Sequence, residues 1–450
     1  GTIRYIYDAG GSKLQKIVTE NPTTANGNQT VITTTTYIES FVYSESSINT
    51  AAGMQLQMIG HEEGRVRIIT PYVNSNDPNN ILSGGIVMPN GKQGVFDYFI
   101  RDNLANVRAT ITEEINKAQG TCTMEDANAS VKQNEEATFG NPGASNEVNN
   151  TRINTPSLWQ ANSSARVSKI QATSTGPQTG PNALLKVMAG DKIKAMVQYY
   201  YAQDPGSSNS NGVTAMVSSF MSSLASGRTV ARIHGQEGAI SGGLNNNTAL
   251  GSFFSNPATP DANPNAPRAY LNWIFFDEQF NFVQEVSGFK RVSQPGDGAS
   301  PLVLTEAKAI KNGYVYVYLS NESGEPVYFD NLTVNHERGQ LIADDHYYAY
   351  GLRIAAISSK SISSSLSKDV PKYGYQGAFS EEVTEFDLNY NEFYFRTYDP
   401  QIGRWTTPDP FDQFASPYSG MGNDPANNTD PSGGIVPIDP IVKTLENVTV

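Results

Sequence analysis

Short runs of β-branched and aromatic residues, each followed by turn formers, recur along the chain and constrain it to a mostly β fold. Residues 1–20 show the unit: Thr2–Tyr7 is rich in strand formers, Asp8–Ser12 has turn chemistry, and Lys13–Val18 alternates polar with apolar side chains. The composition agrees, because 23 Tyr and 39 Gly stand beside only 17% charged residues. Such a chain suits many short strands better than long helices.

Length and charge limit the classes of protein further. A chain of 450 residues exceeds what one core usually serves, so we expect two or more units. The net charge of -13 argues against nucleic acid as a main partner, because binding phosphates needs a basic surface. No apolar run reaches the length of a membrane span. No signal peptide and no initiator Met are visible, so we expect a piece of a longer protein.

Cys122 is the single cysteine, which excludes a disulfide within the chain. We expect it to be an inert thiol in a polar loop rather than a nucleophile. The four histidines show no recognised metal-ligand spacing, and no phosphate-binding loop is present. Gly238–Gly243 lacks the spacing of a nucleophile elbow around Ser241.

The segment Phe395–Pro410 spaces aromatic residues by turn formers and continues to Asn427–Gly433, with Asp409 and Asp430 each before a proline. In order, these forty or so residues resemble the core-domain signature of the RHS-repeat (YD-repeat) family. That signature runs aromatic-x-x-Arg-x-Tyr-Asp-Pro-x-x-Gly-Arg-Phe/Trp, then Asp-Pro, and ends in Asp-Pro-x-Gly.

Further segments resemble the same family. Tyr5–Leu14 follows the Tyr-x-Tyr-Asp-x-x-Gly-x-x-Leu repeat, and Tyr98–Arg108 follows a hairpin in which Ala105 stands for the family's Gly. Tyr373–Gly377 is similar to the Tyr-x-Tyr-Asn-Gly step, with Gln376 in place of Asn. The resemblance implies one continuous antiparallel hairpin sheet that forms part of a cocoon-like shell, capped by the core domain.

The pattern changes between the two parts that carry these motifs. Residues 118 to about 161 are polar and Asn-rich and are expected to be loops, whereas later runs are typical of strands, with an amphipathic helix over 212–224. The predicted organisation is therefore an RHS hairpin segment at 1–117, a polar linker at 118–134, an inserted jelly-roll-like β-sandwich at 135–336, the RHS core domain at 337–434 and the start of a variable tail at 435–450.

The resemblance also implies chemistry at Asp409 and Asp430. In RHS shells that release a C-terminal toxin, aspartates at these positions form an aspartyl protease that cuts just after the last motif. Two adjacent carboxylates share a proton, so one acts as base on water while the other polarises the carbonyl, and Arg404 would stabilise the charge. Gly434, before the expected cut, stands where releasing members usually have Leu. The alternative is that both aspartates only cap the turns of the plug.

Tyr328–Leu332 is similar to the last strand of carbohydrate-binding-module sandwiches, in which an Asp at the position of Asp330 helps to hold a structural Ca²⁺. This ion is the one cofactor implied for the chain. The other interpretation is that Asp330 binds strand-edge amides.

We therefore expect a structural shell of a secreted bacterial polymorphic toxin or surface protein that encloses or presents a C-terminal effector. Its partners would be that effector segment and a secretion or injection apparatus. One alternative is an extracellular adhesin that binds glycans through the inserted sandwich. The other is a self-cleaving aspartyl protease, the one enzymatic activity that the sequence suggests.

Overall fold

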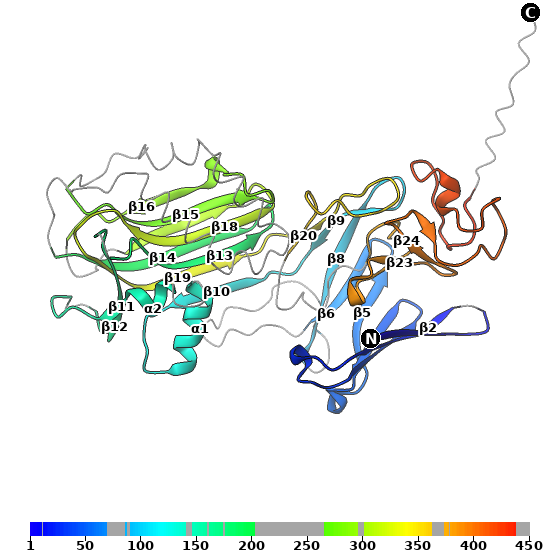
Figure 1. Cartoon of the computed structure of the whole chain (residues 1–450), viewed down its shortest axis with the longest axis horizontal. Helices are drawn as coiled ribbons and strands as arrows, with labels where there is room; N and C mark the ends of the chain where they lie inside the picture. Colours follow the sequence, from blue (N-terminus) through cyan, green and yellow to red (C-terminus); the bar gives the residue numbers. More distant parts are fainter. Residues whose placement is uncertain are drawn as a thin grey trace, which may run out of the picture. The chain divides into compact units, whose positions relative to one another are not determined.

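The computed structural model describes residues 1–10, 12–69, 86–87, 91–140, 146–159, 162–173, 176–202, 265–295, 301–361, 373–377 and 379–437. The chain divides into two compact units: unit 1 comprises Gly1–Glu114 and Leu341–Val450, and unit 2 comprises Ile115–Gln340 (Figure 1). Antiparallel strands dominate both, as the sequence predicted. The helix predicted at 212–224, together with His234 and Ser241, lies outside the described residues.

Unit 1 is organised by an 11-stranded antiparallel sheet. Apart from β7, which pairs only with β8 and lies off the main path, its strands follow one another in sequence order, so neighbouring strands pair as a meander (Figure 1). The strands are β1 (Thr2–Tyr7), β2 (Lys13–Glu20), β3 (Val31–Ile38), β4 (Phe41–Ser46), β5 (Gln55–His61), β6 (Gly64–Ile69), β7 (Ile86–Val87), β8 (Gln93–Arg101), β9 (Val107–Thr112), β20 (Leu341–Asp344) and β21 (Ser359–Lys360). The chain leaves this sheet after β9 and returns to it at β20, which pairs with β9.

The rest of unit 1 is a small sheet with an aromatic core. Its strands are β22 (Glu381–Val383), β23 (Tyr390–Glu392), β24 (Thr397–Asp399) and β25 (Arg404–Trp405). Tyr375, Phe393, Tyr398, Trp405 and Met421 form its buried cluster. Short 3-10 helices are η1 (Thr24–Asn26), η2 (Thr50–Ala52), η5 (Glu385–Asp387) and η6 (Gly420–Asn423) in unit 1, and η4 (Gln284–Val286) in unit 2.

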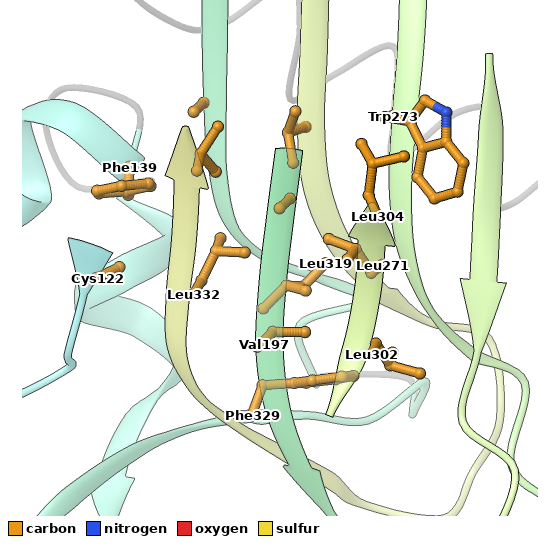
Figure 2. Packing of buried hydrophobic residues seen from close by; sticks show 14 of the residues in the cluster. Cys122, Phe139, Val197, Leu271, Trp273, Leu302, Leu304, Leu319, Phe329 and Leu332 are labelled. Carbon is orange, nitrogen blue, oxygen red and sulfur yellow. The ribbon is translucent and has the colours of Figure 1, made fainter. Parts of the chain in front are cut away.

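Unit 2 is a β-sandwich whose two sheets share one hydrophobic core. The six-stranded sheet holds β10 (Lys117–Cys122), β11 (Arg152–Asn154), β12 (Arg166–Ile170), β14 (Lys192–Tyr200), β17 (Leu302–Lys308) and β19 (Val327–Glu337). The four-stranded sheet holds β13 (Thr179–Val187), β15 (Ala269–Asp277), β16 (Gly288–Arg291) and β18 (Gly313–Asn321). Val197, Phe329 and Leu332 of the first sheet belong to the same buried cluster as Leu271 and Leu319 of the second (Figure 2).

The structure corrects the expectation of loops at 118–161. This part contains β10, the helices α1 (Ala129–Phe139) and α2 (Glu147–Thr151), and β11. β10 pairs with β19, and Asn128 caps α1 by accepting hydrogen bonds from two backbone amides. α1 buries only Glu135 and Phe139, so its sequence carries little helical periodicity.

Cys122 is therefore in a strand rather than in a polar loop. Its thiol is buried at 1% exposure (Figure 2). Burial, with the nearby carboxylate of Glu135, raises the thiol pKa well above its usual value. A raised pKa disfavours the reactive thiolate, so the expected inert character follows from burial.

Candidate functional site

The structure brings the two predicted aspartates to one arginine. The Nη2 atom of Arg396 lies 3.4 Å from Oδ2 of Asp430 and 3.8 Å from Oδ2 of Asp409. Arg396, Asp409 and Asp430 are exposed by only 5%, 7% and 1%. We call these three residues, with Gly433 and Gly434, the C-terminal clamp.

Local turns set the two carboxylates in place. Asp409 Oδ1 accepts a hydrogen bond from the amide of Phe411 at 3.0 Å, two residues on, as is common for aspartate in turns. Asp430 Oδ1 accepts one from the amide of Gly434 at 2.9 Å. Each aspartate therefore caps its own turn and also faces Arg396.

The peptide group between Gly433 and Gly434 is held at both of its polar atoms. Arg396 Nε donates to the carbonyl oxygen of Gly433, while the following N–H, that of Gly434, donates to Asp430. A guanidinium at a carbonyl oxygen can stabilise an oxyanion, and a carboxyl at the nitrogen can protonate a leaving amine. Arg396 and Asp430 thus contact the two polar atoms of this peptide group.

Burial shifts the ionisation of the clamp. It raises the pKa of Asp430, while the Gly434 amide and Arg396 act in the opposite direction. It also lowers the pKa of Arg396, against the attraction of both aspartates. The raised pKa means that Asp430 keeps its proton to a higher pH than an exposed aspartate does.

The arginine of the clamp is Arg396 and not Arg404, the residue chosen from the sequence. Arg404 lies on β25 and its side chain donates to the Asn423 side-chain oxygen. Arg396 follows Phe393 at the spacing of the aromatic-x-x-Arg that begins the family signature. The motif contained this signal, but spacing alone could not decide which arginine reaches the aspartates.

Two exposed aromatic rings cover Gly434. A Cβ atom at this position would lie 2.8 Å from Phe411 Cε2 and 3.0 Å from Phe395 Cδ2. These two rings also pack edge to face, with centroids 5.5 Å apart. A leucine here would have to move both rings, which gives a physical reason for the glycine.

Asp330 is buried at 1% exposure and its oxygens face amide donors. Oδ1 accepts a hydrogen bond from the Asn331 backbone, and Oδ2 accepts from the side-chain amides of Asn162 and Asn331. Burial raises its pKa. Ca²⁺ needs oxygen ligands, so this donor set does not fit a calcium ion. Within the described ranges, no group of three or more His, Cys, Asp or Glu could hold a metal ion.

Two stacked aromatic pairs of unit 2 lie inside the sandwich. Trp159 stacks on Tyr200 at 5.7 Å, and Tyr316 stacks on Tyr318 at 5.0 Å. All four rings are buried, so these two pairs offer no exposed platform for a sugar.

No family model matches the chain. The salivary gland surface protein 1 of Aedes aegypti is 33% identical over 113 residues, which cover 23% of this chain and 3% of that protein. The chain thus spans a very small part of that relative's length.

Two solved structures show distant similarity. The CBM22-1–GH10 modules of a Clostridium thermocellum endo-1,4-beta-D-xylanase, complexed with xylohexaose, align with a TM-score of 0.22 and 12% identity over 45% of this chain and 26% of theirs. A Photorhabdus luminescens Tc holotoxin pore aligns with a TM-score of 0.18 and 13% identity over 96% of this chain and 15% of its own. TM-scores this low do not establish a shared fold.

In the part of the chain that the structure describes, no helix is long and apolar enough to span a membrane.

Proposed function

We propose that the chain is part of the shell of a secreted bacterial toxin or surface protein, and that it encloses or presents a C-terminal effector segment. The observation that carries this proposal is that unit 1 fixes its C-terminal part on the long hairpin sheet and holds residues 430–434 in the clamp. Burying the charged groups of the clamp costs free energy. A function that depends on where the following segment is held would explain why the fold accepts this cost.

Partly buried ion pairs attach the C-terminal part to β2. Lys13 Nζ lies 3.1 Å from carboxylate oxygens of both Glu381 and Glu392. Lys16, which is 0% exposed, contacts Glu385 at 2.8 Å. Removing one partner leaves a charge that is largely out of water without compensation, so these contacts favour one placement.

A second candidate function is self-cleavage, and the clamp favours it. In this reaction Asp409 accepts a proton from a water molecule, and the hydroxide adds to the Gly433 carbonyl carbon, whose oxygen Arg396 stabilises. The C–N bond to Gly434 then breaks, and protonated Asp430 gives its proton to the departing nitrogen. The geometry favours the Gly433–Gly434 bond, one residue before the cut expected from the sequence.

The decisive experiment is the intact mass of the full-length gene product, wild type beside Asp430→Asn. Self-cleavage predicts two fragments in the wild type and one chain in the variant. Fragment masses distinguish a cut before Gly434 from a cut after it, because they differ by one glycine residue. One intact chain in both proteins would exclude self-cleavage and leave the clamp as a structural anchor.

Enclosure is tested separately, by size-exclusion chromatography and limited proteolysis of the same product. The shell proposal predicts that the C-terminal segment elutes with the shell, cut or uncut, and resists a protease that digests it once the shell is denatured. A segment that is digested at once in the native protein would contradict enclosure. Glycan-array binding that disappears on removal of unit 2 would instead favour the adhesin.

A further inference from the structure

Gln376 lies between two segments that are far apart in the sequence. Its backbone N–H donates to Oδ1 of Asn106 at 2.9 Å, and its side-chain Oε1 accepts from the backbone N–H of Asp430 at 3.0 Å. The residue is fully buried and has a left-handed φ of 44°. Such a conformation in a non-glycine residue persists only where the surroundings determine it strongly.

Asp102 holds the Asn106 end of this connection by hydrogen bonds. Asp102 accepts hydrogen bonds from both the backbone and the side-chain amide of Asn106, at 3.0 and 2.9 Å. The side-chain nitrogen of Asn106 is thereby engaged, and its oxygen is turned toward Gln376. The next residue, Val107, donates its N–H to the Gly374 carbonyl oxygen at 2.9 Å, which fixes the backbone just before Gln376.

The other end is the clamp itself. The Asp430 amide is bound by Gln376, and the Asp430 carboxylate accepts the amide of Gly434. The hydrogen bonds therefore run without interruption from the turn at 102–106 through Gln376 to residues 430–434. Asn106, Gln376 and Asp430 are all buried, so water cannot easily replace a lost partner.

We propose that Gln376 is a positioning residue that couples the 102–106 turn to the C-terminal clamp. Loosening the turn then loosens the clamp, although Asn106 and Asp430 are more than three hundred positions apart. The proposal rests on the proposed function only in taking the clamp as the place where the C-terminal segment is held.

Amide hydrogen exchange of the full chain, measured by mass spectrometry, tests the coupling. Gln376→Met removes the acceptor for Asp430 while keeping side-chain length, and exchange of the peptide 428–436 should become at least about tenfold faster. Asn106→Leu should speed exchange of that same peptide, and the double variant should add little to the larger single effect. Gln401→Met is the matched control, because Gln401 is exposed.

Exchange in β3 of unit 1 reports whether each variant is folded. If Asn106→Leu loosens all of unit 1, Gln376→Asn is used instead. The shorter side chain moves the acceptor oxygen away from the Asp430 amide by one methylene and leaves Asn106 unchanged. Faster exchange at 428–436 alone then supports the proposal. Exchange at 428–436 within about twofold of wild type in Gln376→Met would overturn it, as would full additivity of the two substitutions. Intact masses of the same samples judge self-cleavage independently.

Discussion

Asp8, Asp102 and Asp277 each fold the same kind of turn. In each, one carboxylate oxygen accepts the amides two and four residues later, and the aspartate amide donates to the carbonyl oxygen four residues later. The residue three positions on is left-handed at Ala105 (φ 61°) and Phe280 (φ 59°). In each of these three turns, the aspartate side chain thus closes the hairpin.

Ala105 should be the weak point of its turn, since an alanine in this conformation is strained. We predict that Ala105→Gly stabilises unit 1 by about 1 kcal/mol. Urea unfolding followed by hydrogen exchange of peptides from 93–112 measures the effect. Ala109→Gly, the same change within β9, should destabilise by a similar amount, and equal effects at both positions would contradict the argument.

Glu322 should make the stability of unit 2 depend on pH. Burial raises its pKa from an ordinary 4.5 to about 7, against the attraction of Arg268 and Arg291. The folded state therefore retains a proton that the unfolded state loses, and this stabilising term, full below pH 4.5, is lost as the pH rises through 7. It amounts to at most about 3 kcal/mol.

Glu322→Gln stays neutral and should lack this term. Thermal unfolding of unit 2 at pH 5 and pH 8 should therefore show a smaller pH effect in the variant than in the wild type. Identical pH dependence in the two proteins would mean that Glu322 does not hold the proton.

At the scale of elements, β6 and β8 are joined by buried charge. Asp97 on β8 is fully buried and accepts hydrogen bonds from Arg67 at 2.6 and 3.1 Å and from Arg65 at 3.0 Å. Arg67 also reaches Glu114 at 2.8 Å, beyond the end of β9. The charges on three successive segments thus fix the register of this part of the sheet.

Asp97→Asn should cost about 3–5 kcal/mol, because it leaves two buried guanidiniums short of negative charge. The same change in charge at exposed Glu63, Glu63→Gln, should stay within about 0.5 kcal/mol. The free energies of unfolding of the two variants are compared by chemical denaturation, followed by hydrogen exchange of peptides from β6 and β8. Similar small effects at both sites would show that water reaches the network.

These elements show what sequence can and cannot predict. The runs of β-branched and aromatic residues predicted that strands would form. The turn residues between these runs predicted the aspartates that close the hairpins. Arg65 and Arg67 alternate with apolar residues, so strand periodicity alone would point them to solvent. Their burial depends on Asp97, whose proximity only the fold supplies. Phe280 is left-handed against its propensity; it lies in the turn that Asp277 closes, and its ring stacks on Tyr314 at 4.7 Å.

At the candidate site, the two aspartates could be predicted from their motif, but the partner arginine and Gln376 could not. Arg404 and Arg396 stand in the same motif, and only tertiary structure determines which one turns inward. Gln376 acts through a backbone amide and a side-chain oxygen, contacts that leave no characteristic spacing in a sequence.

For the whole molecule, the important point is how the chain enters and leaves unit 2. Ile111 and Leu341 are directly opposite in the β9–β20 pair, although 229 residues separate them. In unit 2, Lys117 of β10 is likewise opposite Glu337 of β19. In each unit, the strand at which the chain leaves or enters is therefore paired with the strand at which it returns. Each unit thus completes its own sheet without strands from the other unit.

We predict that unit 1 folds alone when residues 115–340 are replaced by a short Gly/Asn linker, which turns β9 and β20 into a hairpin. Trp405 is then the single tryptophan, and its fluorescence should report one cooperative unfolding transition. A larger deletion, 115–344, also removes β20 and should give a less stable protein. Absence of a transition in the first variant would show that unit 1 needs unit 2.

The buried Cys122 also has a practical consequence. Within these 450 residues it has no second cysteine to join, so this part of the chain forms no internal disulfide. It should also be slow to react with maleimides in the folded protein. A cysteine introduced at Ile435, which is 47% exposed, would then take a fluorescent label almost alone, beside the clamp, and would report in real time whether the segment around it stays in place.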